Sequence, residues 1–112
     1  SGPESFPLLE QTTMGELVTQ TPRLLIVKEG APLRINCTYE YGGYPNLFWY
    51  TQHLDGGSLQ FLLREEPQEN IQKRKDGFFA AHLKEEKSFH LQKESSDLSD
   101  SADYFCSFSA QW

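Results

Sequence analysis

Two cysteines far apart in the chain constrain its fold more than any other feature. Cys37 and Cys106 are the only cysteines among the 112 residues. An even count with one long separation predicts a single long-range disulfide and an oxidising compartment, with two unrelated free thiols as the alternative. Closing so long a loop would stabilise the folded state by roughly 4 kcal/mol, because the unfolded chain loses entropy. The fold is therefore expected to bring the middle and the end of the chain together.

Short runs of alternating apolar and polar residues follow one another from Leu17 onward, separated by turn signals such as Glu29-Gly30. Leu33, Ile35 and Cys37 alternate with polar residues, which is typical of a strand with one face in a core. The repetition of such runs along a single domain predicts an all-β sandwich. The strands are expected at 17–20, 24–27, 33–38, 47–52, 59–63, 77–83, 88–93 and 102–106.

Two of these strands are apolar on both faces. In the strand 47–52, Leu47 and Trp49 lie on one face, whereas Phe48 and Tyr50 lie on the other with Gln52. The same happens at 59–63. A strand that faces water on one side is expected to be polar there. The simplest explanation is a second partner that covers the outer face; the alternative is a few tolerated surface aromatics.

The composition argues against nucleic-acid binding and catalysis. The formal net charge is −6, and the one basic cluster, 73–75, is interpreted as a solvated loop. His53, His82 and His90 lie apart, without metal-ligand spacing, and no nucleophile or phosphate-binding motif accompanies them. No apolar run approaches the ~20 residues that a membrane span needs. We therefore expect no enzyme, no cofactor and no metal site.

Several segments together resemble a T-cell receptor alpha-chain variable domain, an immunoglobulin domain of the V-set type encoded by an alpha or shared alpha/delta segment. The segments that carry the resemblance are 16–20, 36–39, 43–45, 47–52, 59–63, 77–78, 88–93 and 99–102. In the immunoglobulin sandwich, a disulfide between the two sheets packs on a tryptophan, and a tyrosine precedes the second cysteine by two residues. Trp49 and Tyr104 match these core positions.

The resemblance implies an immunoglobulin-like V-type β-sandwich with Greek-key connections over residues 15–112. Residues 1–14 are interpreted as an N-terminal extension; docking of Phe6, Leu8 and Leu9 on the domain is the alternative. The tyrosine hydroxyl is expected to bond backbone a few residues upstream. Asp100 is expected to pair with Arg74 or Lys75, or to have no partner.

The resemblance also implies a function. Such a domain pairs with a second variable domain, of a beta or delta-like chain, and the pair binds a peptide held by a histocompatibility molecule. It is the extracellular part of a plasma-membrane receptor, whose anchor lies beyond this sequence. The residues expected at the partner-chain interface are Tyr50, Gln52, Leu59, Phe61 and Phe105. An invariant V-set protein that serves as a structural partner chain or an adhesion domain is the alternative.

Three loops are expected to contact antigen: 41–46, 65–70, and a third that begins at Ser107. The residues expected to contact it are Tyr41, Tyr44, Asn46, Glu65, Glu66, Ser107 and Phe108. Large, fairly rigid tyrosine side chains are typical of such loops. For Tyr44 and Pro45 the alternative is a turn packed on the domain, and for the glutamates it is ordinary solvated charge.

Asn36-Cys37-Thr38 is a sequon for N-glycosylation, which fits secretion. The alternation of the strand 33–38 places Asn36 on the solvent-facing side. A glycan at Asn36 is therefore expected to point away from the core.

A joining segment and a final strand normally follow the second cysteine in the resembled family, and this sequence does not include them. The edge left unpaired would carry Phe105, Phe108 and Trp112, and exposed apolar edges seek partners. A truncated chain, a non-rearranged variable-like protein, and a domain completed by another chain or by residues 1–14 are all compatible with this. If the chain folds alone, we expect self-association through the open edge.

Overall fold

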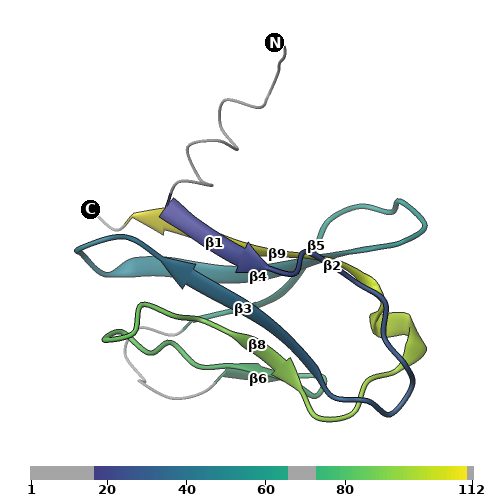
Figure 1. The fold of residues 1–112 in the computed structure, drawn as a ribbon. Coiled ribbons are helices and arrows are strands. Elements are labelled where there is room, and N and C mark those ends of the chain that lie inside the picture. Colours follow the sequence, from purple (N-terminus) through teal and green to yellow (C-terminus); the bar gives the residue numbers. More distant parts are fainter. Residues whose placement is uncertain (1–16, 66–72, 111–112) are drawn as a thin grey trace.

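The computed structural model describes residues 17–65 and 73–110, which form two antiparallel β-sheets packed against each other (Figure 1). The strands are β1 Val18–Thr21, β2 Leu24–Leu25, β3 Leu33–Tyr39, β4 Pro45–His53, β5 Gln60–Arg64, β6 Lys73–Lys75, β7 Phe78–Ala80, β8 Leu91–Lys93 and β9 Ala102–Ala110. A short 3-10 helix, η1 Leu98–Asp100, precedes β9. One sheet has the order β1-β3-β8-β7-β6 and the other the order β2-β9-β4-β5. The predicted all-β sandwich is therefore confirmed.

The strands near β7 differ from the sequence prediction in their bounds. The strand expected at 77–83 stops at Ala80, because the chain then turns back through a bridge between Leu83 and Ser88. The basic cluster at 73–75 is not a loop but β6, the edge strand of its sheet. Charged side chains are common on edge strands, where they oppose pairing with other chains.

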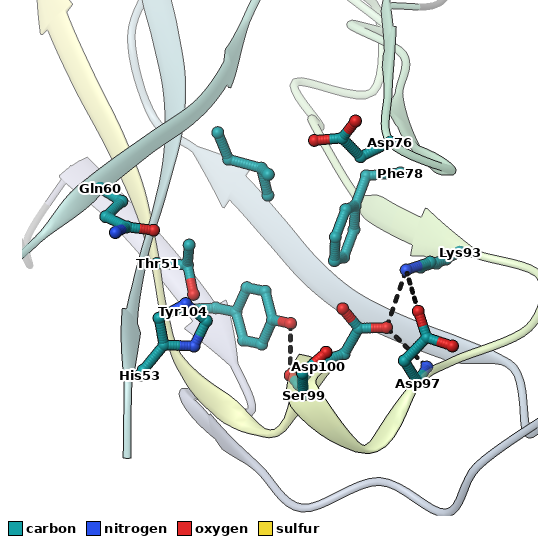
Figure 2. Close-up of a pocket in the computed structure, with 11 residues that line it drawn as sticks. Thr51, His53, Gln60, Asp76, Phe78, Lys93, Asp97, Ser99, Asp100 and Tyr104 are labelled. Atoms are coloured by element: carbon teal, nitrogen blue, oxygen red, sulfur yellow. Dashed lines mark hydrogen bonds and ion pairs between the residues drawn. The ribbon is translucent and has the colours of Figure 1, made fainter. Parts of the chain in front are cut away.

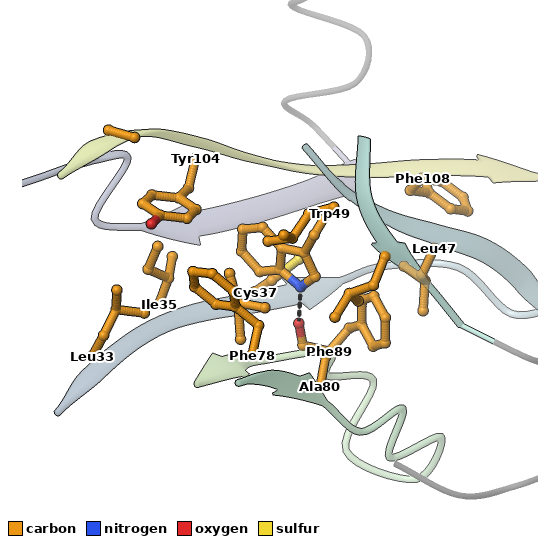
Figure 3. Close-up of a cluster of buried hydrophobic side chains, with 14 of the residues drawn as sticks. Leu33, Ile35, Cys37, Leu47, Trp49, Phe78, Ala80, Phe89, Tyr104 and Phe108 are labelled. Carbon is orange, nitrogen blue, oxygen red and sulfur yellow. Dashed lines mark hydrogen bonds between the residues drawn. The ribbon is translucent and has the colours of Figure 1, made fainter. Parts of the chain in front are cut away.

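The core lies between the two sheets and follows the predicted alternation. In β3 the side chains of Leu33, Ile35, Cys37 and Tyr39 are buried, whereas the residues between them are exposed. Figure 3 shows Trp49 at the centre of this core, where its indole Nε1 donates a hydrogen bond to the carbonyl oxygen of Phe89 over 2.9 Å. A buried indole N–H needs such an acceptor.

The predicted disulfide joins the two sheets. Cys37 in β3 is bonded to Cys106 in β9, and their Cα atoms lie 6.4 Å apart. Trp49 pairs directly with Cys106 across β4 and β9, so the indole packs beside the sulfurs. The link therefore fixes the two sheets at the position where their largest side chain is buried.

The corner before β9 has the expected tyrosine bond but a different ion pair. The hydroxyl of Tyr104 donates to the carbonyl oxygen of Asp100 over 2.5 Å. The carboxylate of Asp100 accepts from Lys93 Nζ at 2.8 Å, so the prediction of Arg74 or Lys75 as its partner was wrong (Figure 2). Lys93 ends β8 beside the corner, whereas β6 lies two strands further out.

A glycine makes room for this lysine. A Cβ built on Gly77 would lie 3.0 Å from Cε of Lys93, which is closer than most real contacts. Gly77 also has a φ of +84°, a conformation that side chains disfavour. The ammonium group of Lys93 lies 4.8 Å from the ring centroid of Phe78 and is largely buried. The absence of a side chain at Gly77 therefore leaves space for the lysine that pairs with Asp100.

The two edges of β9 are occupied differently. One edge pairs with β4 along its whole length, and the other pairs with β2 only at Ala102 and Asp103. Further along this second edge, the side-chain amide of Gln20 donates to the carbonyl oxygen of Tyr104 over 2.6 Å and accepts from the N–H of Cys106 over 2.9 Å. Within residues 17–65 and 73–110, no strand other than β2 pairs with this edge.

Candidate recognition surfaces

Register places nine side chains on the outer face of the four-stranded sheet, and we call them the aromatic face. They are Leu24, Asp103 and Gln52 in one row, Phe105, Tyr50 and Phe61 in the next, and Ser107, Phe48 and Arg64 in the third. Each alternates with a side chain that points into the core, as expected for a pleated strand. The rings of Tyr50 and Phe61 meet edge to face, with centroids 5.8 Å apart.

This face remains accessible to solvent. Phe61 is 49% exposed, and Leu59, which precedes β5, is 53% exposed. Tyr50, Phe105 and Gln52 are partly exposed. The structure thus brings four of the five residues predicted for a partner interface onto one face and leaves the fifth exposed beside them. Their role in pairing stays a prediction.

An irregularity between β4 and β5 decides which side chains reach this face. The register shifts between Trp49 and Tyr50, so Trp49 pairs with Leu63 while Tyr50 pairs with Phe61. Leu62 and Leu63 are consequently both buried, although simple alternation would turn one of them outward. Such a bulge bends a strand and re-aims its side chains. The outer positions of β5 therefore go to Phe61 and Arg64.

Glu65 directly follows β5, where the second loop was predicted to begin, but neither the predicted antigen contact nor the alternative of ordinary solvated charge fits its side chain. Its side chain is only 4% exposed. The N–H of Glu65 donates to the carbonyl oxygen of Leu47 over 2.9 Å, so the chain still follows β4 here and the carboxylate points inward. A buried carboxylate is costly unless other groups bond to it.

Two aromatic side chains contact that carboxylate, and a third joins them through His82. Oε2 of Glu65 accepts a short hydrogen bond from the hydroxyl of Tyr44 and lies 3.3 Å from Nδ1 of His82. Nε2 of His82 lies 2.8 Å from the hydroxyl oxygen of Tyr39. We call these four residues the loop-base network, because they connect the first loop, the end of β5, the chain after β7 and the end of β3. The other carboxylate oxygen, Oε1, is buried and has no hydrogen-bond partner among the described residues.

The network changes the acidity of its tyrosines. Burial, followed by the hydrogen bond to Glu65 and the charge of that carboxylate, raises the pKa of Tyr44 to about 12. Burial and the Glu65 charge also raise the pKa of Tyr39. No motif in the sequence marks His82 or Tyr39 as members of the network.

Much of the first loop packs on the domain, although it was predicted to contact antigen. Tyr44 points into the network and Pro45 is fully buried, as expected of a turn packed on the domain. Asn46 is part of β4 and pairs with Ser109. Tyr41 is half-buried, with its ring centroid 5.2 Å from that of Phe108. The exposed tip of the loop consists of Gly42 and Gly43.

The third loop begins later than predicted. β9 continues to Ala110, so Ser107 is a strand residue on the aromatic face. Phe108 is 3% exposed and packs on Tyr39 and Tyr41, so its predicted antigen contact was wrong. Because β4 pairs with β9 as far as Ala110, the side chains of β9 keep alternating between the core and the outer face up to that point. Glu66 and the rest of the predicted second loop, together with Trp112 and residues 1–14, lie outside the described residues.

Comparison with known proteins decides the family. The immunoglobulin V-set domain family matches residues 20–111. T cell receptor alpha variable 9-2 of Homo sapiens is 47% identical over 102 residues, which cover 91% of this chain and 89% of that protein. The chain belongs to the T-cell receptor alpha variable family. T-cell receptor alpha chain V region CTL-F3 of Mus musculus is 43% identical over 102 residues, covering 91% of this variable domain and 76% of that protein.

The sequon of this alpha variable domain lies away from both candidate surfaces. Asn36 is exposed on β3, in the other sheet, and its Oδ1 accepts a hydrogen bond from Nε of Arg34 over 2.7 Å. Thr38 is exposed on the same side of the strand. A glycan there would extend from the five-stranded sheet and leave the aromatic face open.

The described part of this alpha variable domain has no candidate membrane-spanning helix and no candidate metal site. None of its helices has the length and apolar character needed to cross a membrane. Among the same residues, no group of three or more histidine, cysteine, aspartate or glutamate side chains could hold a metal ion.

Proposed function

We propose that this variable domain pairs through its aromatic face with a second immunoglobulin variable domain, of a beta or delta-like chain. The pair then binds a peptide held by a histocompatibility molecule. One observation carries the proposal: Phe105, Tyr50 and Phe61 form a continuous aromatic row that faces solvent. Exposed apolar patches of this kind mark sites of protein association.

The position of the loops supports the second half of the proposal. Pro45 pairs with Ala110, so the first loop lies beside the end of β9. Glu65 bonds to Leu47, so the second loop starts at the same end of the sandwich. Loops gathered at one end of a variable domain form its recognition surface. The role is binding rather than catalysis, in the extracellular part of a plasma-membrane receptor.

Pairing is tested by changing the aromatic row. Phe61→Asp and Phe105→Asp each place a charge in the proposed interface, so we expect at least a tenfold loss of affinity for an immobilised beta-chain variable domain. Phe79→Asp is the matched control, because Phe79 is a half-buried phenylalanine on the outer face of the other sheet. Thermal melting of each variant separates lost pairing from lost folding. Equal binding by all three variants would contradict the proposal.

A further inference from the structure

Two arginines lie over the aromatic face at its opposite lateral edges. Cζ of Arg23 is 4.9 Å from the ring centroid of Phe105, and Cζ of Arg64 is 5.1 Å from that of Phe48. Arg23 directly precedes β2 and Arg64 belongs to β5, and these strands are the two edges of the four-stranded sheet. The aromatic row therefore lies between two guanidinium groups.

The charge of this region is opposite in sign to that of the whole chain. The formal net charge of the protein is −6. Asp103 is the only carboxylate on the aromatic face as defined above, against the two arginines. Its Oδ1 lies 3.9 Å from Nε of Arg23, beyond hydrogen-bond distance, and Arg23 is 67% exposed. One carboxylate therefore does not balance the two positive charges.

Most donors of the two guanidinium groups have no hydrogen-bond partner among the described residues. Each arginine has five N–H donors. Nε of Arg64 donates to the carbonyl oxygen of Glu65 over 3.2 Å, and Arg23 donates no hydrogen bond within the described residues. A partner that covers the phenylalanines also removes water from the guanidinium groups stacked on them. Burying an N–H donor away from water costs free energy unless a protein acceptor takes the place of the lost water. A carboxylate is the acceptor that best matches the charge and geometry of a guanidinium group.

We infer that the partner domain carries a carboxylate at each lateral edge of its pairing face, one opposite Arg23 and one opposite Arg64. This inference rests on the proposed pairing and specifies its chemistry. Three inter-strand spacings separate β2 from β5, so the two carboxylates are about 14 Å apart across the strands. A second copy of this chain would present arginines at these places instead. The same two residues therefore disfavour self-pairing through this face.

Association kinetics test the inference with the intact chain. The probes are two versions of a beta-chain variable domain: one has a carboxylate at each lateral edge of its pairing face, and in the other these are changed to amides. Arg23→Gln and Arg64→Gln should each slow association with the acidic probe about two- to fivefold at low salt. Both variants should also weaken its dependence on ionic strength. With the amide probe, the variants and the original chain should associate at similar rates.

Arg34→Gln is the matched control, because Arg34 is an exposed arginine on the five-stranded sheet. Unchanged rates and salt dependence in Arg23→Gln and Arg64→Gln would overturn the inference, while loss of binding in Phe61→Asp would leave the pairing proposal intact. Unchanged binding by Phe61→Asp would instead overturn the pairing itself. In sedimentation velocity without a probe, the double arginine variant should form more dimer than the original chain; an unchanged distribution would contradict the like-charge argument.

Discussion

Replacing Tyr44 with phenylalanine tests the loop-base network most directly. The hydroxyl of Tyr44 donates to the buried carboxylate of Glu65, and no other described group except His82 contacts that carboxylate's Oε2 through a side chain. A hydrogen bond to a charged group contributes about 1.5–3 kcal/mol. Because Oε1 already has no partner among the described residues, the variant leaves the carboxylate almost unsupported. We therefore expect Tyr44→Phe to lower the free energy of unfolding by about 2 kcal/mol.

Urea denaturation of the whole chain, followed by tryptophan fluorescence, measures this loss. With an m-value of about 2 kcal/mol/M, the midpoint should fall by about 1 M urea. Tyr41→Phe makes the same chemical change in the same loop, but the Tyr41 hydroxyl has no recorded bond within the described residues, so a loss below about 0.5 kcal/mol is expected. The double variant of Tyr44→Phe with Glu65→Gln should cost clearly less than the two single changes added together. Additive losses, or equal losses in the two tyrosine variants, would refute the reasoning.

Alkaline pH gives an independent measurement of the same bond. An unfolded tyrosine ionises near pH 10, whereas burial and Glu65 raise the pKa of folded Tyr44 to about 12. A folded pKa above the unfolded one means that this contribution to stability is fully present below pH 10 and is lost as the pH rises towards 12. The stability advantage of the original chain over Tyr44→Phe should therefore shrink across that interval. An advantage that stays constant from pH 9 to 12 would show that Tyr44 ionises as it does in water.

Two further predictions concern the corner and the sequon. Lys93→Met leaves the mostly buried carboxylate of Asp100 without its cation, so the free energy of unfolding should fall by about 3 kcal/mol, measured by urea denaturation. Adding Asp100→Leu should recover most of that loss, and no recovery would contradict the buried ion pair. Secretion from mammalian cells should give a glycan on Asn36 that peptide N-glycosidase removes, with a mass shift that persists in Thr38→Ser and disappears in Thr38→Ala. A chain secreted without that shift would show that the sequon is unused.

The sequence predicted those features that depend on strict alternation and on spacing. The period-two pattern around Cys37 predicted the buried face of β3, and Trp49 and Tyr104 lie in the core as their spacing from the cysteines indicated. The apolar outer face of β4 was visible in the same way, because Phe48 and Tyr50 occupy positions where a solvated strand would be polar. Local periodicity therefore predicts the face that a side chain takes in a regular strand such as β3, but not across the bulge that buries both Leu62 and Leu63.

Features that depend on contacts between distant segments were not predictable from the sequence. Glu65 looked like a loop glutamate, because nothing local shows that β4 continues beside it and that Tyr44 and His82 approach from other segments. Phe108 looked like a loop residue, because the end of β9 is decided by its partner strand and not by its own sequence. Lys93 pairs with Asp100 in place of the expected partner, and it fits there because Gly77, which is distant in the sequence, has no side chain. In each case the exposure or the partner of a side chain was predicted from neighbouring residues in the sequence, whereas a distant segment determines it in the fold.

The amide of Gln20 sets a limit on any strand that adds to the free edge of β9. A primary amide carries N–H donors and a carbonyl acceptor side by side. Here the amide of Gln20 donates to Pro22 and Tyr104 and accepts from Cys106, so it occupies the positions on β9 where an incoming backbone would bond. A strand that pairs with β9 near Phe108 meets no such competitor among residues 17–65 and 73–110, but one that extends back to Cys106 must displace this side chain from both bonds. Strand addition to this domain is therefore favourable only up to a boundary, and a single residue of the opposite sheet determines its place.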